Sequence, residues 1–184
     1  MKKLSVFNFV TLNGFFKGRD NDISWHQHGS DEGDFAAEGA GSDSILLFGR
    51  VTYEMMAGFW PSPAAFEQFP EVAKGMNKSE KIVFSRTLKK AGWQNSRIVK
   101  NDIVKEITKL KATAQKDMTI LGSGSIVTQF AEAGLIDEYQ LMVDPLALGE
   151  GTPIFKGMKK QLKLKLANTR TFKSGVVLLT YQSK

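Results

Sequence analysis

The sequence contains no cysteine. This absence excludes disulfides, thiolate metal ligands and cysteine nucleophiles, and with them deamination by cysteine-bound zinc. It also fits a reducing compartment, and we expect a cytoplasmic protein. Asn8 interrupts the apolar run near the N-terminus and no small-residue cleavage site follows it, so this run is not typical of a signal peptide. No later apolar run approaches the length of a membrane span, and we expect no membrane partner.

Positively charged residues modestly outnumber negatively charged ones. The chain has 25 Lys and Arg against 19 Asp and Glu, a net charge of +6, which raises the hypothesis of nucleic-acid binding. The cations are dispersed, however, and in 162–166 leucine alternates with lysine, which is typical of a strand with lysines on its wet face. We therefore expect no nucleic-acid partner, although a basic surface would attract a small polyanion.

Histidine is scarce as well, with two in the chain. His26 and His28 stand two residues apart in a polar stretch, and a paired metal role is conceivable for them. No third ligand is indicated, and such residues are more often solvated. We therefore expect no metal site.

A chain of 184 residues with 42% apolar and 24% charged residues is typical of one folded domain, and we expect residues 1–184 to form it. Apolar periodicity predicts helices at 31–40, 53–57, 64–76 with a kink at Pro70, 103–111 and 126–131. It predicts strands at 3–10, 45–48, 81–84, 97–99, 118–121, 136–143, 162–166 and 176–181. This order predicts a three-layer α/β fold whose mixed, mostly parallel sheet is closed by an antiparallel C-terminal hairpin.

Three loops that follow predicted strands carry residues suited to phosphate. Glycine lets backbone approach a ligand, arginine supplies a bidentate donor, and a helix start presents free N–H groups, with Thr52 expected as the N-cap of the second helix. Ligands of open α/β sheets bind outside the carboxyl ends of strands, so all three loops could meet one phosphorylated cofactor. The loops are Gly49-Arg50-Val51-Thr52, Ser85-Arg86-Thr87 and Gly122-Ser123-Gly124-Ser125.

A competing interpretation is the dinucleotide fingerprint of the Rossmann fold. Gly122 and Gly124 open a helix after a strand, and Asp144 follows at about the twenty-residue distance of the ribose-binding acid. Val127 stands where the third glycine belongs, and arginines such as Arg50 suit a 2′-phosphate better than they suit NAD. We treat this interpretation as the lesser one.

The motifs G-R-V-T-Y-E (49–54), K-I-V-F-S-R-T (81–87) and I-L-G-S-G-S-I-V (120–127), with L-I-D-E-Y-Q-L-M-V-D-P-L-A-L-G-E-G-T-P-I-F (135–155), resemble the dihydrofolate reductase-like superfamily. The resemblance covers nearly the whole chain and is nearest to the reductase domain of the bifunctional riboflavin-biosynthesis deaminase/reductase. It implies that fold, a homodimer and NADPH as cofactor. It places Arg50 and Thr52 near the cofactor phosphates, Ser85 and Arg86 near the 2′-phosphate, and Gly122 to Ser125 around the pyrophosphate.

The resemblance implies less about the substrate. The first loop of riboflavin-type relatives commonly reads S-L-D-G, and here it reads Thr11-Leu12-Asn13-Gly14, so an amide replaces the substrate-binding carboxylate. Asp31, Glu32 or Asp34 could correspond to the folate enzymes' carboxylate, and Asp31 or Asp34 could then serve as a proton donor. Alternatively, Asp31 and Glu32 could simply favour the first turn of a helix. A flat heterocycle would suit a wall of large side chains, which could equally be core: Trp25, Phe35, Met55, Phe59 and Trp60.

The function that follows is an NADPH-dependent reductase that transfers hydride to a small heterocycle with an imine or carbonyl carbon. The alternative is a non-catalytic relative that binds NADPH or another ligand after losing the carboxylate at Asn13.

Overall fold

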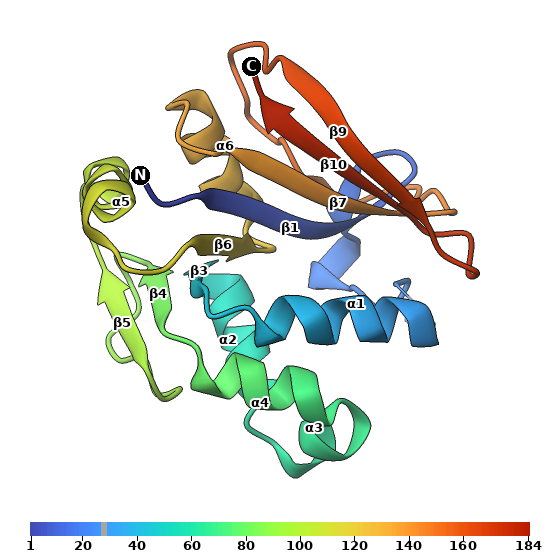
Figure 1. The fold of residues 1–184 in the computed structure, drawn as a ribbon, viewed down its shortest axis with the longest axis horizontal. Helices are drawn as coiled ribbons and strands as arrows, with labels where there is room; N and C mark the ends of the chain where they lie inside the picture. The colour runs from blue at the N-terminus through green and yellow to red at the C-terminus, as the bar shows by residue number, and fades with distance from the viewer. Residues whose placement is uncertain (27–28) are drawn as a thin grey trace.

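The computed structural model describes residues 1–26 and 29–184, so His28 of the histidine pair lies outside the described residues. Its centre is an eight-stranded sheet with the order β5-β4-β3-β6-β1-β7-β10-β9, beside a small two-stranded sheet of β2 and β8. Figure 1 shows α5 and α6 on one side of the large sheet and α1 and α4 on the other. The predicted three-layer α/β architecture is confirmed.

The strands are β1 (Leu4–Thr11), β2 (Phe15–Lys17), β3 (Ile45–Gly49), β4 (Lys81–Phe84), β5 (Ser96–Val99), β6 (Met118–Leu121), β7 (Glu138–Asp144), β8 (Thr152–Pro153), β9 (Leu164–Thr171) and β10 (Val177–Ser183). The helices are α1 (Ser30–Gly41), α2 (Arg50–Phe59), α3 (Pro63–Gln68), α4 (Pro70–Lys78), α5 (Ile103–Thr113) and α6 (Gly124–Glu132), and η1 (Arg19–Asn21) is a 3-10 turn.

The sheet is parallel from β5 to β7 and antiparallel beyond it. β1 pairs in parallel with both β6 and β7, so it lies in the middle of the sheet. β10 pairs antiparallel with β7 and with β9, which places β9 at the edge, as expected for its lysine-rich alternation. The carboxyl ends of β3, β4, β6, β1 and β7 therefore lie along one edge of the sheet.

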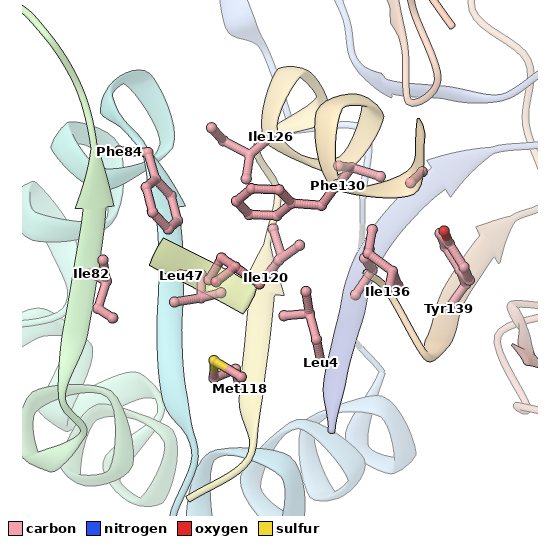
Figure 2. Packing of buried hydrophobic residues seen from close by; sticks show 14 of the residues in the cluster. Leu4, Leu47, Ile82, Phe84, Met118, Ile120, Ile126, Phe130, Ile136 and Tyr139 are labelled. Carbon is pink, nitrogen blue, oxygen red and sulfur yellow. The ribbon is translucent and has the colours of Figure 1, made fainter. Parts of the chain in front are cut away.

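Strand alternation assigns the two faces of the sheet. Leu4, Val6 and Val10 of β1 point into the main core, which packs under α5 and α6 and includes Ile107 and Phe130. Figure 2 shows Leu4 and Phe130 within this core. All five side chains are at most 4% exposed, so this layer is a continuous apolar interior. Its burial stabilises the fold by roughly 25 cal/mol for each Å² of apolar surface removed from water.

The opposite face holds two smaller clusters. Phe48 of β3 packs with Tyr53 and Trp93 beneath α2 and α4. Near the antiparallel end, Phe172 and Val176 form another cluster, against which Phe7, Phe9 and Phe35 pack. The space between these two clusters lies over β1 and β6, and the cleft described below occupies it.

Three local expectations differ from the structure. Pro70 does not kink a helix, because α3 ends at Gln68 and α4 starts with Pro70 at its first position, which a proline tolerates well. Residues 15–17 and 152–153 form a short antiparallel pair where no strand was predicted. Thr52 is not an N-cap, because Gly49 already occupies that position and α2 begins at Arg50 directly after β3.

In the described part of the chain, no helix is both long and apolar enough to cross a membrane.

Candidate functional site

A cleft of about 1110 Å³ begins at the carboxyl ends of β3 and β6 and continues across the sheet face beneath α1. Gly49 and Gly122 line its first part, at the two strand ends. Ser5 and Thr119, near the amino ends of β1 and β6, line its far part together with Ala36 of α1. The cleft thus joins a strand-end compartment, where two helices start, to a compartment between α1 and the sheet.

The two helix starts in the first compartment are tied together by hydrogen bonds. The Ser123 hydroxyl accepts a bond from the Gly49 N–H (2.8 Å) and donates one to the Leu121 carbonyl (3.0 Å). The Ser123 N–H in turn donates to the Thr52 hydroxyl at 3.2 Å. Thr52, expected as a cap of its own helix, therefore joins α2 to the start of α6. The first turns of both helices line the same cleft. N–H groups at a helix start lack a carbonyl partner from a preceding turn, and in α6 the Ile126 N–H donates to the Ser123 carbonyl at 2.8 Å.

Close backbone approach requires glycine on the α6 side. Gly122 has φ +58°, and a Cβ added to it would lie 2.9 Å from Cγ2 of Thr52. A Cβ on Gly124 would lie 2.8 Å from the Phe16 ring. Asn8, which interrupts the apolar run of β1, fixes the same loop by donating from Nδ2 to the Gly122 carbonyl at 3.1 Å. The conformation of this loop therefore requires glycine at positions 122 and 124.

Positive charge gathers around these helix starts. Arg50 is the first residue of α2, and its guanidinium is paired with Glu54 at 2.8 Å while remaining about half exposed. Lys17 follows Phe16, which contacts Gly124, and Lys156 lies two residues beyond Ile154, whose carbonyl also faces Gly124. Three cations and two helix N-termini therefore surround one compartment, an arrangement that favours a polyanion.

The loop Ser85-Arg86-Thr87 lies beside this compartment but outside its lining. Phe84, which does line the cleft, is the register partner of Gly49, so the loop starts next to the first turn of α2. The Ser85 hydroxyl accepts bonds from the N–H groups of Thr87 and Leu88, at 3.2 and 2.9 Å, which closes a local turn. Arg86 is exposed at the tip of this turn.

Large side chains form the walls of the cleft. All five residues expected to contact a flat heterocycle line it: Trp25, Phe35, Met55, Phe59 and Trp60. His26 lines it as well: its ring stacks on Phe9 with centroids 3.7 Å apart, and its Nδ1 lies 2.8 Å from an oxygen of Asp144. Both side chains of this His–Asp pair are 4% exposed.

Asp144 is thus held by an imidazole at the end of β7, away from the Gly122 loop. This position contradicts the Rossmann interpretation, which needs the acid beside the dinucleotide ribose. Within the described part of the chain, no three His, Cys, Asp or Glu side chains come together as a set that could hold a metal ion.

Four residues expected at the substrate, Asn13, Asp31, Glu32 and Asp34, lie outside the lining. Asn13 binds the backbone of Leu148, donating to its carbonyl at 2.8 Å and accepting from its N–H at 3.2 Å. Asp31 pairs with Lys173 at 3.7 Å, and Asp34 is exposed on α1. The neighbouring Glu32 is buried and accepts a hydrogen bond from the Ser174 hydroxyl, so it docks α1 on the β9–β10 turn.

Sequence reasoning missed several residues of the site. Nothing in the local pattern marks Phe16 or Lys17, because the β2–β8 pairing that carries them to α6 joins segments far apart in the chain. Asn8 was interpreted only as a residue that interrupts an apolar run. A polar amide in the middle of a central strand requires a partner, and that partner is the glycine loop.

Residues 2–178 match the family described as the RibD C-terminal domain. The chain belongs to this family. The Bacillus subtilis (strain 168) protein YyaP, described as uncharacterized, is 37% identical over 175 residues, which cover 94% of this chain and 90% of YyaP. The resemblance expected from the motifs is therefore confirmed at the level of the family.

Solved structures share the fold. A putative riboflavin biosynthesis protein from Shewanella sp. PV-4 has a TM-score of 0.76 at 22% identity, and the match covers 99% of each chain. The Thermotoga maritima diaminohydroxyphosphoribosylaminopyrimidine deaminase/5-amino-6-(5-phosphoribosylamino)uracil reductase has a TM-score of 0.70 at 15% identity. That match covers all of this chain and 57% of the Thermotoga chain. The fold of the family's reductase domains is thus the fold of this chain.

Proposed function

We propose that the protein is an NADPH-dependent reductase of a small heterocyclic compound. The observation that carries the proposal is the strand-end compartment, where two helix N-termini locked by Ser123 meet three cations. A dinucleotide pyrophosphate matches this arrangement, because its charge is best balanced by fixed N–H groups and flexible cations together. Membership of the RibD C-terminal domain family supports the same cofactor.

The fit extends to both ends of the dinucleotide. We assign the 2′-phosphate to Ser85 and Arg86, which follow Phe84, the register partner of Gly49. At the other end, Met55, Trp60 and Trp25 offer an apolar wall for the nicotinamide and for a flat acceptor. When bound, the cofactor would supply the hydride for an imine or carbonyl carbon, while the chain aligns the two rings and excludes water.

Replacing Arg50 with Ala tests the cofactor site. A charge-assisted hydrogen bond contributes about 1.5–3 kcal/mol, so we expect Arg50→Ala to weaken NADPH binding by about tenfold or more. Arg97→Ala is the matched control, because Arg97 is similarly exposed, is paired with Glu106 at 2.8 Å and lies outside the cleft. The measurement is a fluorescence titration of both variants with NADPH.

Equal affinity of Arg50→Ala and wild type would contradict the site. A loss of the same size in Arg97→Ala would attribute the effect to net charge rather than to a contact with the cofactor.

A further inference from the structure

The compartment beneath α1 is open because the helix presents small residues to it. Gly33, Ala36 and Gly39 line the cleft at intervals of three residues, on one side of the helix. A Cβ built on Gly33 or on Gly39 would meet no heavy atom within 4 Å. Glycine inside a helix costs roughly 0.5–1 kcal/mol relative to alanine, so helix stability does not explain either residue. What the two glycines provide is room above the sheet.

The floor of this compartment is polar but uncharged. The hydroxyls of Ser5 and Thr119 lie 3.1 Å apart on adjacent strands. Gln140 of β7, the register partner of Phe7, lies two residues further along the same face and also lines the cleft. The Ser5 hydroxyl is also 3.3 Å from the Met118 carbonyl, and the Gln140 amide donates to Glu138 at 3.1 Å. Hydroxyls and a carboxamide can donate to or accept from a carbonyl, imine or amide group of a ligand.

The charges at this end disfavour an anion. Lys3 is the cation of the lining here, and its ammonium is bound to Glu138 at 2.6 Å. The carboxylate of Asp117 lines the compartment and accepts a hydrogen bond from the Lys3 N–H at 2.9 Å. A phosphate placed here would meet the Asp117 carboxylate and a lysine that is already paired with the buried Glu138. The three cations beside the helix starts lie at the other end of the cleft.

We propose that the compartment beneath α1 binds the acceptor, and that this acceptor is an uncharged, largely apolar ring compound without a phosphate group. The proposal rests on the proposed function for the identity of the donor. This acceptor differs from that of the Thermotoga enzyme, which is described as a reductase of a phosphoribosylamino-uracil and so acts on a phosphorylated compound. Apolar side chains such as Phe7 and Phe35 would hold the ring. The polar side chains of Ser5, Thr119 and Gln140 would bind its polar edge.

A matched pair of aldehydes tests the charge preference. 2-Naphthaldehyde is neutral, whereas 6-formyl-2-naphthoate carries the same ring and aldehyde with one added carboxylate. Quenching of the tryptophans that line the cleft, Trp25 and Trp60, reports binding with and without NADPH. We expect the neutral compound to bind at least about tenfold more tightly than the anion. Equal or tighter binding of the anion, or no binding of the neutral aldehyde, would overturn the proposal.

Substitutions that fill the compartment test whether the acceptor binds beneath α1. Gly39→Leu and Gly33→Leu should each reduce affinity for 2-naphthaldehyde by about tenfold or more, because the new side chain occupies the ligand's space. Gly58→Leu is the matched control: it also lies in a helix, its Cβ would meet nothing within 4 Å, and it does not line the cleft. Thermal unfolding of each variant verifies that the fold is retained.

The same proteins are titrated with NADPH, which separates the two proposals. Unchanged NADPH affinity with lost aldehyde affinity in the α1 variants supports both. If Gly39→Leu and Gly33→Leu bind the aldehyde as tightly as wild type, the compartment beneath α1 is not the acceptor site, and the proposed cofactor site is unaffected. If the protein binds the aldehyde but does not bind NADPH, the proposed NADPH-dependent function is refuted and the ligand site beneath α1 is retained.

Discussion

Lys81 provides a prediction about stability that can be worked out from the structure. It is the first residue of β4, its side chain is fully buried, and no carboxylate is among its hydrogen-bond partners. The ammonium instead donates to three backbone carbonyls, the shortest bond being 2.6 Å to Ser79 just beyond the end of α4. It also lies 4.5 Å from the centroid of the Trp93 ring. These contacts only partly replace water.

Burial lowers the pKa of Lys81 from 10.5 to about 8. Because the folded pKa lies below the unfolded one, the unfolded chain binds more protons between pH 8 and 10.5, and stability rises with pH in that window. The full shift corresponds to about 3 kcal/mol at 1.36 kcal/mol per pH unit. Below pH 8 both states are protonated, and the folded protein bears the whole cost of burying the charge.

Replacing Lys81 with Met removes this pH dependence while keeping most of the side-chain volume. We expect the wild-type free energy of unfolding, relative to that of Lys81→Met, to rise by about 1–3 kcal/mol between pH 7.5 and 10. Guanidinium chloride unfolding at several pH values, followed by circular dichroism, measures both proteins. Burial also raises the pKa of Tyr139 to about 12, which lowers stability above pH 10 in both proteins and so cancels in the comparison. Parallel pH curves for the two proteins would refute the reasoning.

Two further substitutions test how the cleft is held. Asn13→Asp should lower the unfolding free energy by about 1 kcal/mol, because a carboxylate cannot donate to the Leu148 carbonyl. The affinity for NADPH should stay unchanged. A gain of reductase turnover would instead support a substrate role for residue 13. Ser123→Ala should lower the unfolding free energy by about 1–3 kcal/mol, since the partly buried Gly49 N–H loses its acceptor, and it should also weaken NADPH binding. An unaltered denaturant midpoint and NADPH affinity would show that the helix starts do not depend on this hydroxyl.

The strand ends of the sheet could be predicted from sequence because each carries a local signal. The buried runs 45–48, 81–84 and 118–121 end where glycine or serine follows, and the structure places strands within one residue of these limits. Their convergence on one edge followed from the parallel order. Gly49, Arg50, Thr52 and the Gly122–Ser125 loop accordingly line one cleft.

Residues whose role depends on distant partners could not be placed in the same way. Asn13 was assigned by its position in a motif, but its amide is engaged by Leu148, which lies in a different loop. Asp31 and Glu32 have the same local pattern, yet Glu32 is buried against Ser174 and Asp31 pairs with Lys173. Which acidic residue of a helix turns inward depends on the angle at which the helix packs, and α1 has too weak an apolar stripe to define that angle from sequence.

The central claim is that NADPH binds in the strand-end compartment with its nicotinamide near the aromatic wall. Titrating the wild-type protein with NADPH and with NADH, while recording energy transfer from tryptophan to the reduced nicotinamide, tests it most directly. We predict saturable one-to-one transfer from Trp25 and Trp60, with NADPH favoured by about tenfold or more because of its 2′-phosphate. No transfer from either cofactor would contradict the account, and equal affinities would remove the role of Ser85 and Arg86.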